Sequence, residues 1–307
     1  MVVTPGNGNP QPGRPPTRRP RKRKHCEQHP LAKFQSLQYC MMTYPIPSST
    51  PPLCQRIHKR RCSTLPTDPQ AEMLGQKLGQ TPTYLTHDGK SWVIHVKRWL
   101  PTPSRDAFLA EWNLHPQSRH EIQVYGKSCL EKRWSQSWGF SYKYSGNVNA
   151  ARPIEESTVI RSLLDTINGL LLIDEEDNAK NNTPQEERPY NGCLQNWYTP
   201  NDHIGLHADD ERSLNAAFPI WSLSWGGTRR FLLRPKKSKK KTAVNNNNHI
   251  IISDEPIELL LEDGDMVLMG GTCQETHKHE VPKFRKTMDP PTSDRINWTI
   301  RAFQPSS

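Results

Sequence analysis

The order of apolar and polar residues predicts few helices and many short strands. Residues 91–96 (SWVIHV) are rich in β-branched and aromatic side chains and predict a strand. Helical periodicity follows at 103–112, where Phe108 and Trp112 are four residues apart, and again at 153–172. From residue 192 onward, short apolar runs alternate with turn residues and predict strands at 193–198, 220–225, 230–233, 257–261, 265–269, 275–281 and 296–302. Such a series of short strands is typical of a β-sandwich or a jelly roll.

These patterns divide the chain into three regions. Residues 1–81 contain 13 of the 28 prolines and few periodic apolar runs, so we expect a disordered tail that cannot bury enough apolar surface to fold. Residues 82–190 combine helical patterns with an aromatic-rich stretch, and residues 191–303 form the mainly β core. Within that core, the lysine- and asparagine-rich segment 235–256 predicts a flexible insertion.

Charge is concentrated at the N-terminus. The formal net charge is +10, and residues 1–62 contain twelve Lys/Arg against the single acidic Glu27. The run RRPRKRK at 18–24 fits a nuclear localisation signal or a nucleic-acid-binding arm, although a solvated basic tail has the same composition. The lysine run at 236–241 either follows a phosphate backbone or keeps an insertion soluble.

The cysteines and the hydropathy exclude other classes of protein. The seven cysteines are scattered without a CxxC pair, so the sequence predicts neither a disulfide framework nor a Cys-type zinc site. There is no run of eighteen apolar residues and no apolar N-terminal stretch. We therefore expect a reducing intracellular compartment and no membrane partner.

Histidines and an aspartate predict a metal site. His207 and Asp209 form an H-x-D pair, and on an extended strand residues two apart point to the same side. A third ligand would come from a distant strand, where His277 and His279 are the candidates. Two histidines and one carboxylate form the facial triad of non-haem Fe(II) oxygenases, although a zinc hydrolase can use the same ligands.

Two arginines near the C-terminus predict an anion site. Arg295 and Arg301 are six residues apart in RINWTIR, so on a strand they share one face with Asn297. Guanidinium groups bind carboxylates bidentately, and one arginine at each end would suit a dicarboxylate such as 2-oxoglutarate. On an exposed edge strand, the same arginines would be ordinary surface residues, and the histidines upstream favour the anion site.

Taken in order, these motifs resemble the AlkB family of Fe(II)- and 2-oxoglutarate-dependent dioxygenases. The resemblance covers roughly residues 90–303 and rests on NWY (196–198), DHIGLHADDE (202–211), PIWSLSWGGTRRF (219–231), HEVP (279–282) and RINWTIR (295–301). QVYGK (123–127) and YKYSG (142–146) are similar to the substrate region of the eukaryotic nuclear DNA/RNA-repair branch. The resemblance implies a mostly β fold with flanking helices, in which a double-stranded β-helix (jelly-roll) core follows an N-terminal nucleotide-recognition region.

The resemblance also implies the ligands of the metal and of the cosubstrate. Fe(II) would be held by His207, Asp209 and His279, the last preferred over His277 because it directly precedes the family's x-V/L-P step; the family often has Trp where His277 stands. 2-Oxoglutarate would be held by Asn196, Tyr198 and Arg295 at the distal carboxylate, and by Asn297 and Arg301 at the end that chelates iron.

A base must leave the stack to reach the metal, so a flipping pocket is implied as well. Tyr144 matches the aromatic position that stacks on the flipped base, with His207 on its other side. Tyr142 would be a neighbouring pocket hydroxyl, Glu211 would read the exocyclic edge of the base, and Tyr125 would fill the gap left in a duplex.

The function implied is oxidative dealkylation of bases such as 1-methyladenine and 3-methylcytosine, with O2 and 2-oxoglutarate as cosubstrates, in DNA alkylation repair. DNA is favoured over RNA, and a nuclear monomer is expected. Two alternatives stay open at this point. One is a 2-oxoglutarate oxygenase that acts on RNA or on protein side chains, and the other is a catalytically inactive nucleic-acid-binding module.

Overall fold

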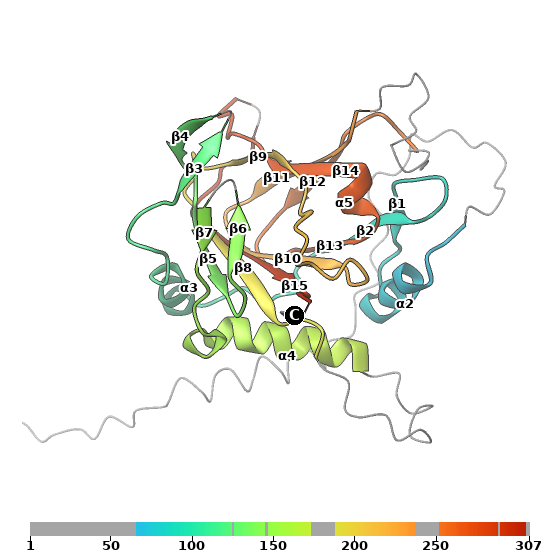
Figure 1. Cartoon of the computed structure of the whole chain (residues 1–307), viewed down its shortest axis with the longest axis horizontal. Coiled ribbons are helices and arrows are strands. Elements are labelled where there is room, and N and C mark those ends of the chain that lie inside the picture. The colour runs from blue at the N-terminus through green and yellow to red at the C-terminus, as the bar shows by residue number, and fades with distance from the viewer. Residues whose placement is uncertain are drawn as a thin grey trace, which may run out of the picture. The chain divides into compact units, whose positions relative to one another are not determined.

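Two antiparallel β-sheets face each other in the computed structural model, which describes residues 66–124, 126–144, 147–172, 188–237, 252–287 and 289–304. The larger sheet has seven strands in the order β1-β2-β13-β10-β15-β8-β5, and the smaller has four in the order β12-β11-β14-β9. Figure 1 shows the smaller sheet above the larger one. The predicted mostly β, jelly-roll fold is therefore confirmed.

The strands of the larger sheet are β1 (Thr83–Tyr84), β2 (Ser91–Val96), β13 (Met266–Gly271), β10 (Ile220–Gly226), β15 (Arg295–Arg301), β8 (Gly192–Tyr198) and β5 (Trp134–Trp138). Those of the smaller sheet are β12 (Ile257–Leu261), β11 (Arg229–Pro235), β14 (His277–Val281) and β9 (Ile204–His207). Two separate hairpins are β3 (Glu121–Val124) with β4 (Lys127–Leu130), and β6 (Tyr142–Tyr144) with β7 (Asn147–Asn149). The helices are α2 (Pro69–Leu78), α3 (Arg105–Trp112), the 3-10 turn η1 (Ile154–Glu156), α4 (Thr158–Leu172) and α5 (Cys273–Thr276).

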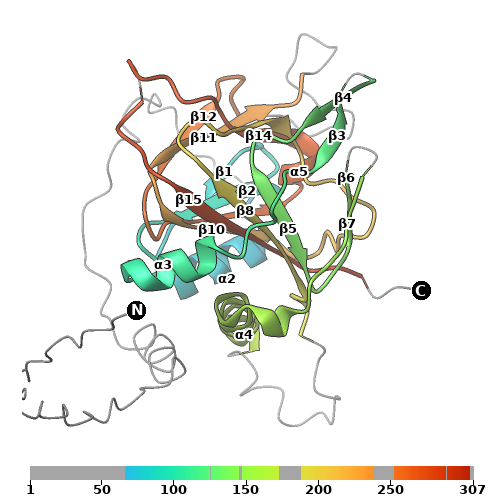
Figure 2. The same cartoon turned by 90° about the vertical axis from the view of Figure 1, so that its left-hand side faces the viewer.

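Helices cover the outer face of the larger sheet. Both Figure 1 and Figure 2 show α2, α3 and α4 on the side of that sheet that faces away from the smaller one. This explains why every residue of β8 is buried. Gln195 donates to the Glu111 carboxylate of α3 (3.1 Å) and Trp197 to its carbonyl (2.9 Å). Asn196 and Tyr198 alternate with these two residues along the strand, so their side chains point to the opposite face.

The space between the sheets is apolar at one end and polar at the other. The apolar end is filled from both sheets, by Val93, Val267 and Met269 of the larger and by Phe231 and Leu233 of the smaller. Each such buried side chain contributes about 1.5–3 kcal/mol to stability. Polar residues of β8, β15, β9 and β14 line the other end. The apolar end thus holds the two sheets together, and the polar end is left to form a site.

Ordered structure begins earlier than the sequence suggests. The tail was expected to be disordered through residue 81, but Pro69–Leu78 forms helix α2. Asp68 caps it by accepting from the backbone N–H groups of Gln70 and Ala71, and Gly79 ends it in the left-handed region with φ 63°. Residues 1–65, including the basic run at 18–24, lie outside the described residues.

Two further differences concern the C-terminal half. The strand expected at 275–281 begins at His277, because Cys273–Thr276 form the helical turn α5. Of the expected insertion at 235–256, residues 238–251 lie outside the described residues. Among the helices that the structure describes, none has the length and apolar character needed to span a membrane.

Candidate metal and cosubstrate site

Three side chains that the sequence proposes as metal ligands lie together between the sheets. His207 ends β9, and its Cα is paired across the sheet with that of His279 on β14. One ligand atom from each of His207, Asp209 and His279 lies within 4.8 Å of the other two. Among the described residues, these are the His, Cys, Asp or Glu side chains that lie close enough together, as a group of three, to bind one metal ion.

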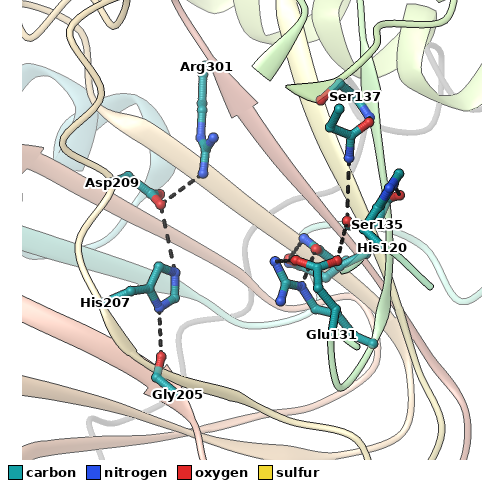
Figure 3. Close-up of polar contacts among 12 residues, drawn as sticks. His120, Glu131, Ser135, Ser137, Gly205, His207, Asp209 and Arg301 are labelled. Atoms are coloured by element: carbon teal, nitrogen blue, oxygen red, sulfur yellow. Dashed lines mark hydrogen bonds and ion pairs between the residues drawn. The ribbon is translucent and has the colours of Figure 1, made fainter. Parts of the chain in front are cut away.

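Neighbouring groups fix the orientation of these ligands. The Nδ1 of His207 lies 2.9 Å from the Gly205 carbonyl, which leaves Nε2 turned toward Asp209 Oδ1 at 3.8 Å (Figure 3). A second ring nitrogen bonded to a carbonyl is the usual arrangement of a metal-binding histidine. Asp209 lies beyond the end of β9, so strand alternation does not place it. Its backbone N–H donates instead to Gln274 Oε1 of α5 at 2.9 Å.

The structure distinguishes the two candidate histidines of β14. Both His277 and His279 are buried. The ring of His279 lies 4.2 Å from that of His207, centroid to centroid. His277 bonds through Nδ1 to Thr276 Oγ1 at 2.8 Å and is not part of the cluster. The geometry therefore favours His279, and its role as a ligand stays a prediction.

The protonation states suit metal binding. Burial acts to raise the pKa of Asp209, but the charges of Arg301 and the two histidines outweigh it and lower that pKa to about 2. Burial lowers the pKa of His279 to about 3 and also lowers that of His207. At neutral pH, Asp209 is therefore an anion and both histidines are neutral, which are the forms that bind a metal.

The residues proposed for 2-oxoglutarate line the same pocket as the metal cluster. Arg295, Asn297 and Arg301 share one face of β15, as the six-residue spacing predicts, and Asn196 and Tyr198 face them from β8. β15 is a central strand with both arginines only 2% exposed, so these are not surface residues of an edge strand.

Arg295 carries hydrogen-bond donors that nothing in the described protein satisfies. Its Nη2 donates to Ser224 Oγ at 2.6 Å, while Nε and Nη1 are buried and have no partner among the described residues. Burial lowers the pKa of Arg295 only to about 10, so the group remains a cation. Burial also raises the pKa of Tyr198, whose hydroxyl remains a donor. An uncompensated buried cation is costly, and a carboxylate fits these donors.

Sequence reasoning missed one charged residue of this pocket. Arg133 comes just before β5, is 5% exposed and lines the pocket together with Tyr198 and Arg295. Its Nε donates to Asn196 Oδ1 at 2.7 Å. The sequence signal for Arg133 was Glu131, an opposite charge two residues earlier at the start of a strand. Such pairs are ordinary in surface sequences, so this one did not single out Arg133.

A larger cavity of about 470 Å³ adjoins the pocket and shares Asp209, Met269 and Arg301 with it. Glu211 lines this cavity, as do Lys236 and Lys237 from the end of β11. The backbones of Tyr142 and Tyr144 form β6, but their side chains lie outside the described residues, as does Tyr125. The proposed base contacts of these three tyrosines therefore stay predictions.

Comparison with known proteins agrees with this geometry. The sequence model of the 2OG-Fe(II) oxygenase superfamily matches residues 94–301 of this chain. The chain is 28% identical to DNA oxidative demethylase ALKBH2 of Arabidopsis thaliana, over 68% of this chain and 65% of the relative. It is 32% identical to DNA oxidative demethylase ALKBH2 of Mus musculus, over 61% of this chain and 68% of that relative. With alpha-ketoglutarate-dependent dioxygenase alkB homolog 3 of Mus musculus, it shares 33% identity over 38% of this chain and 37% of that relative. The match thus spans less than two thirds of the Arabidopsis relative and of mouse alkB homolog 3.

Proposed function

The chain belongs to the 2OG-Fe(II) oxygenase superfamily and to its AlkB family, and we propose that it removes alkyl groups from nucleic-acid bases by oxidation. One observation carries the proposal. The His207, Asp209 and His279 cluster shares a pocket with a buried arginine, Arg295, two of whose donors have no partner among the described residues. A metal triad beside a carboxylate-binding cation is what a 2-oxoglutarate oxygenase requires.

The residues present fit both groups. His207, Asp209 and His279 would hold Fe(II), whose open coordination positions accept O2 and 2-oxoglutarate. When bound, these groups would supply the oxidation of an N-alkyl carbon, in which 2-oxoglutarate would be converted to succinate and CO2 and the alkyl carbon would be released from the base as an aldehyde.

The protein's own residues bind and orient the reactants. Arg295 and Tyr198 would donate to the distal carboxylate of 2-oxoglutarate, joined by the amide of Asn196. Asn297 Nδ2 donates to Ser222 Oγ (2.9 Å) and to the Leu223 carbonyl (2.8 Å), so this side chain is fixed in place beside the proposed chelating end. Arg301 would hold that same end while it keeps Asp209 ionised.

The substrate we propose is a base flipped out of DNA, of the 1-methyladenine or 3-methylcytosine type. The larger cavity opens beside Asp209, and Glu211 on its wall supplies an acceptor for an exocyclic amino group. Lys236, which lies 3.8 Å from Asp210 Oδ2, and Lys237 line the same cavity and would supply cations for a phosphate. Two of the relatives are named DNA oxidative demethylases, which favours DNA over RNA. We further propose that the protein acts as a monomer in the nucleus, directed there by the basic run at 18–24.

A direct assay tests the proposal. The protein, with Fe(II), ascorbate and 2-oxoglutarate, would be incubated with matched oligonucleotides bearing 1-methyladenine or 3-methylcytosine. These would be offered as duplex DNA, single-stranded DNA and RNA, with mass spectrometry to detect methyl loss and Asp209→Asn as the inactive control. We expect methyl loss that depends on 2-oxoglutarate, fastest on DNA. Succinate formation without methyl loss would overturn the substrate assignment. If neither succinate nor methyl loss is detected although metal is bound, the protein would instead be a nucleic-acid-binding module without catalytic activity.

A further inference from the structure

Asn196 can help to bind a carboxylate only if its amide is turned the right way. An asparagine side chain has one acceptor oxygen and one donor NH2 at nearly the same position, and a carboxylate accepts only the donor. In this structure, Nδ2 lies 3.4 Å from Asn297 Oδ1, on the pocket side. A neighbouring group must hold the amide in this orientation.

Arg133 is that neighbour. Its Nε donates to Asn196 Oδ1 at 2.7 Å, and a guanidinium has donors only. The oxygen of Asn196 must therefore face Arg133, and the NH2 must face the pocket. Both side chains are at most 5% exposed, so water does not compete for this contact.

Arg133 is itself anchored by a buried network. Its Nη2 lies 3.3 Å from Glu131 Oε1, and the other oxygen of that carboxylate accepts from Ser135 Oγ at 2.7 Å (Figure 3). Asn149 of β7 donates to Ser135 Oγ at 3.4 Å and accepts the backbone N–H of Ser137 at 3.0 Å. This network keeps the guanidinium in one place, because Glu131 is itself held by Ser135 of β5, and Ser135 by Asn149 of β7.

We propose that Arg133 is a positioning residue for the cosubstrate, which acts by fixing the amide of Asn196 so that its NH2 faces the distal carboxylate. The inference rests on the proposed function for the identity of that ligand. It assigns a role to the residue directly before β5, a strand that carries none of the residues proposed from the sequence.

The test measures binding and not turnover. Mn(II)-loaded full-length protein would be titrated by calorimetry with 2-oxoglutarate and, separately, with 2-oxobutyrate, which has the same chelating end but no distal carboxylate. For Arg133→Met, we expect the Kd for 2-oxoglutarate to rise about tenfold or more, the worth of a charge-assisted contact. The Kd for 2-oxobutyrate should stay within about threefold, because a purely structural defect would weaken both ligands equally.

A double-mutant cycle isolates the route through Asn196. Once Asn196→Ala has removed the amide, adding Arg133→Met should change the Kd for 2-oxoglutarate by less than about twofold. Two independent losses that multiply would overturn the proposal, as would an unchanged Kd in Arg133→Met. Absence of 2-oxoglutarate binding by the unmutated protein would instead overturn the proposed function.

Two further variants guard against misfolding. Arg133→Met leaves Glu131 buried without its cation, so the pair Glu131→Gln with Arg133→Met replaces both charges by neutral groups of similar size. This pair should show the same selective loss of 2-oxoglutarate binding. Arg234→Met removes the ion pair of Arg234 with Glu280 on the outer face of β11, away from the pocket, and should change neither Kd.

Discussion

Arg301 Nη2 forms an ion pair with Asp209 Oδ1 at 2.8 Å, and both side chains are at most 3% exposed. The first residue is proposed to hold 2-oxoglutarate, and the second is proposed to hold iron. The two halves of the site therefore share a charged contact, and a change to either residue acts on both. Removing one member of a buried ion pair strongly lowers the free energy of unfolding, because the other charge stays buried without that partner.

Substitution of Asp209 separates metal binding from stability. Asp209→Asn keeps an acceptor for Arg301, whereas Asp209→Ala removes the carboxylate that forms an ion pair with this buried guanidinium. We expect both variants to lose about hundredfold or more in Mn(II) affinity, since an anionic ligand is gone. In metal-free protein, the alanine variant should lose about 3–5 kcal/mol of unfolding free energy, and the asparagine variant less. Mn(II) titration and urea denaturation measure the two effects, and retained metal affinity in either variant would contradict the triad.

The two histidines of β14 should respond differently to substitution. His279→Ala removes a proposed ligand and should abolish measurable Mn(II) binding. His277→Asn keeps a polar group near Thr276 Oγ1 and should bind Mn(II) within about threefold of the unmutated protein, at a cost of about 1 kcal/mol in stability for the altered hydrogen bond. Equal loss of metal in both variants would show that the ligand set is misassigned.

The parts of the site that could be predicted from the sequence are those fixed by strand alternation. Arg295, Asn297 and Arg301 share a face of β15 whatever lies around it, so their common direction follows from their spacing. The metal histidines were proposed as candidates, but only the pairing of β9 with β14 brings His279 to His207. That pairing joins residues far apart in the chain, and periodicity does not report it.

The parts that the sequence did not reveal depend on such distant contacts. Arg133 reaches Asn196 because β5 pairs with β8, and the chain between these strands contains α4. Gln274 holds the backbone of Asp209 from the helical turn α5, which the sequence did not predict and whose last two residues were expected to begin a strand. Helix α2 did have local signals in Asp68-Pro69 and Gly79, but the proline-rich composition of the tail outweighed them.

Arg295 should have opposite effects on function and on stability. Arg295→Met removes a buried cation whose Nε and Nη1 have no partner in the described protein, so the ligand-free fold should be as stable as before or more stable. The same change should raise the Kd for 2-oxoglutarate by about tenfold to a hundredfold, through loss of charge-assisted hydrogen bonds. Urea denaturation without ligand and calorimetry with Mn(II) test both claims. A destabilised variant with unchanged affinity would mean that Arg295 has a structural role.

Glu111 should make stability depend on pH. Burial raises the pKa of this α3 carboxyl from 4.5 to about 7, against the opposing effect of its hydrogen bonds to Gln195 and Ser157. The folded state thus favours the protonated form, so the contribution of Glu111 is fully present below about pH 4.5 and is lost as pH rises to about 7. The loss is on the order of 3 kcal/mol at most.

Glu111→Gln removes this titration. The difference in unfolding free energy between the unmutated protein and the variant, measured by urea denaturation from pH 5 to pH 8, should shift steadily in favour of the variant up to about pH 7 and then level off. Glu262→Gln, which changes an exposed carboxylate paired with Lys97, serves as the control and should track the unmutated protein. A constant difference for Glu111→Gln across this range would mean that the carboxyl of Glu111 is already ionised in the folded protein at pH 5. The contact of α3 with β8 would then be formed by a buried anion.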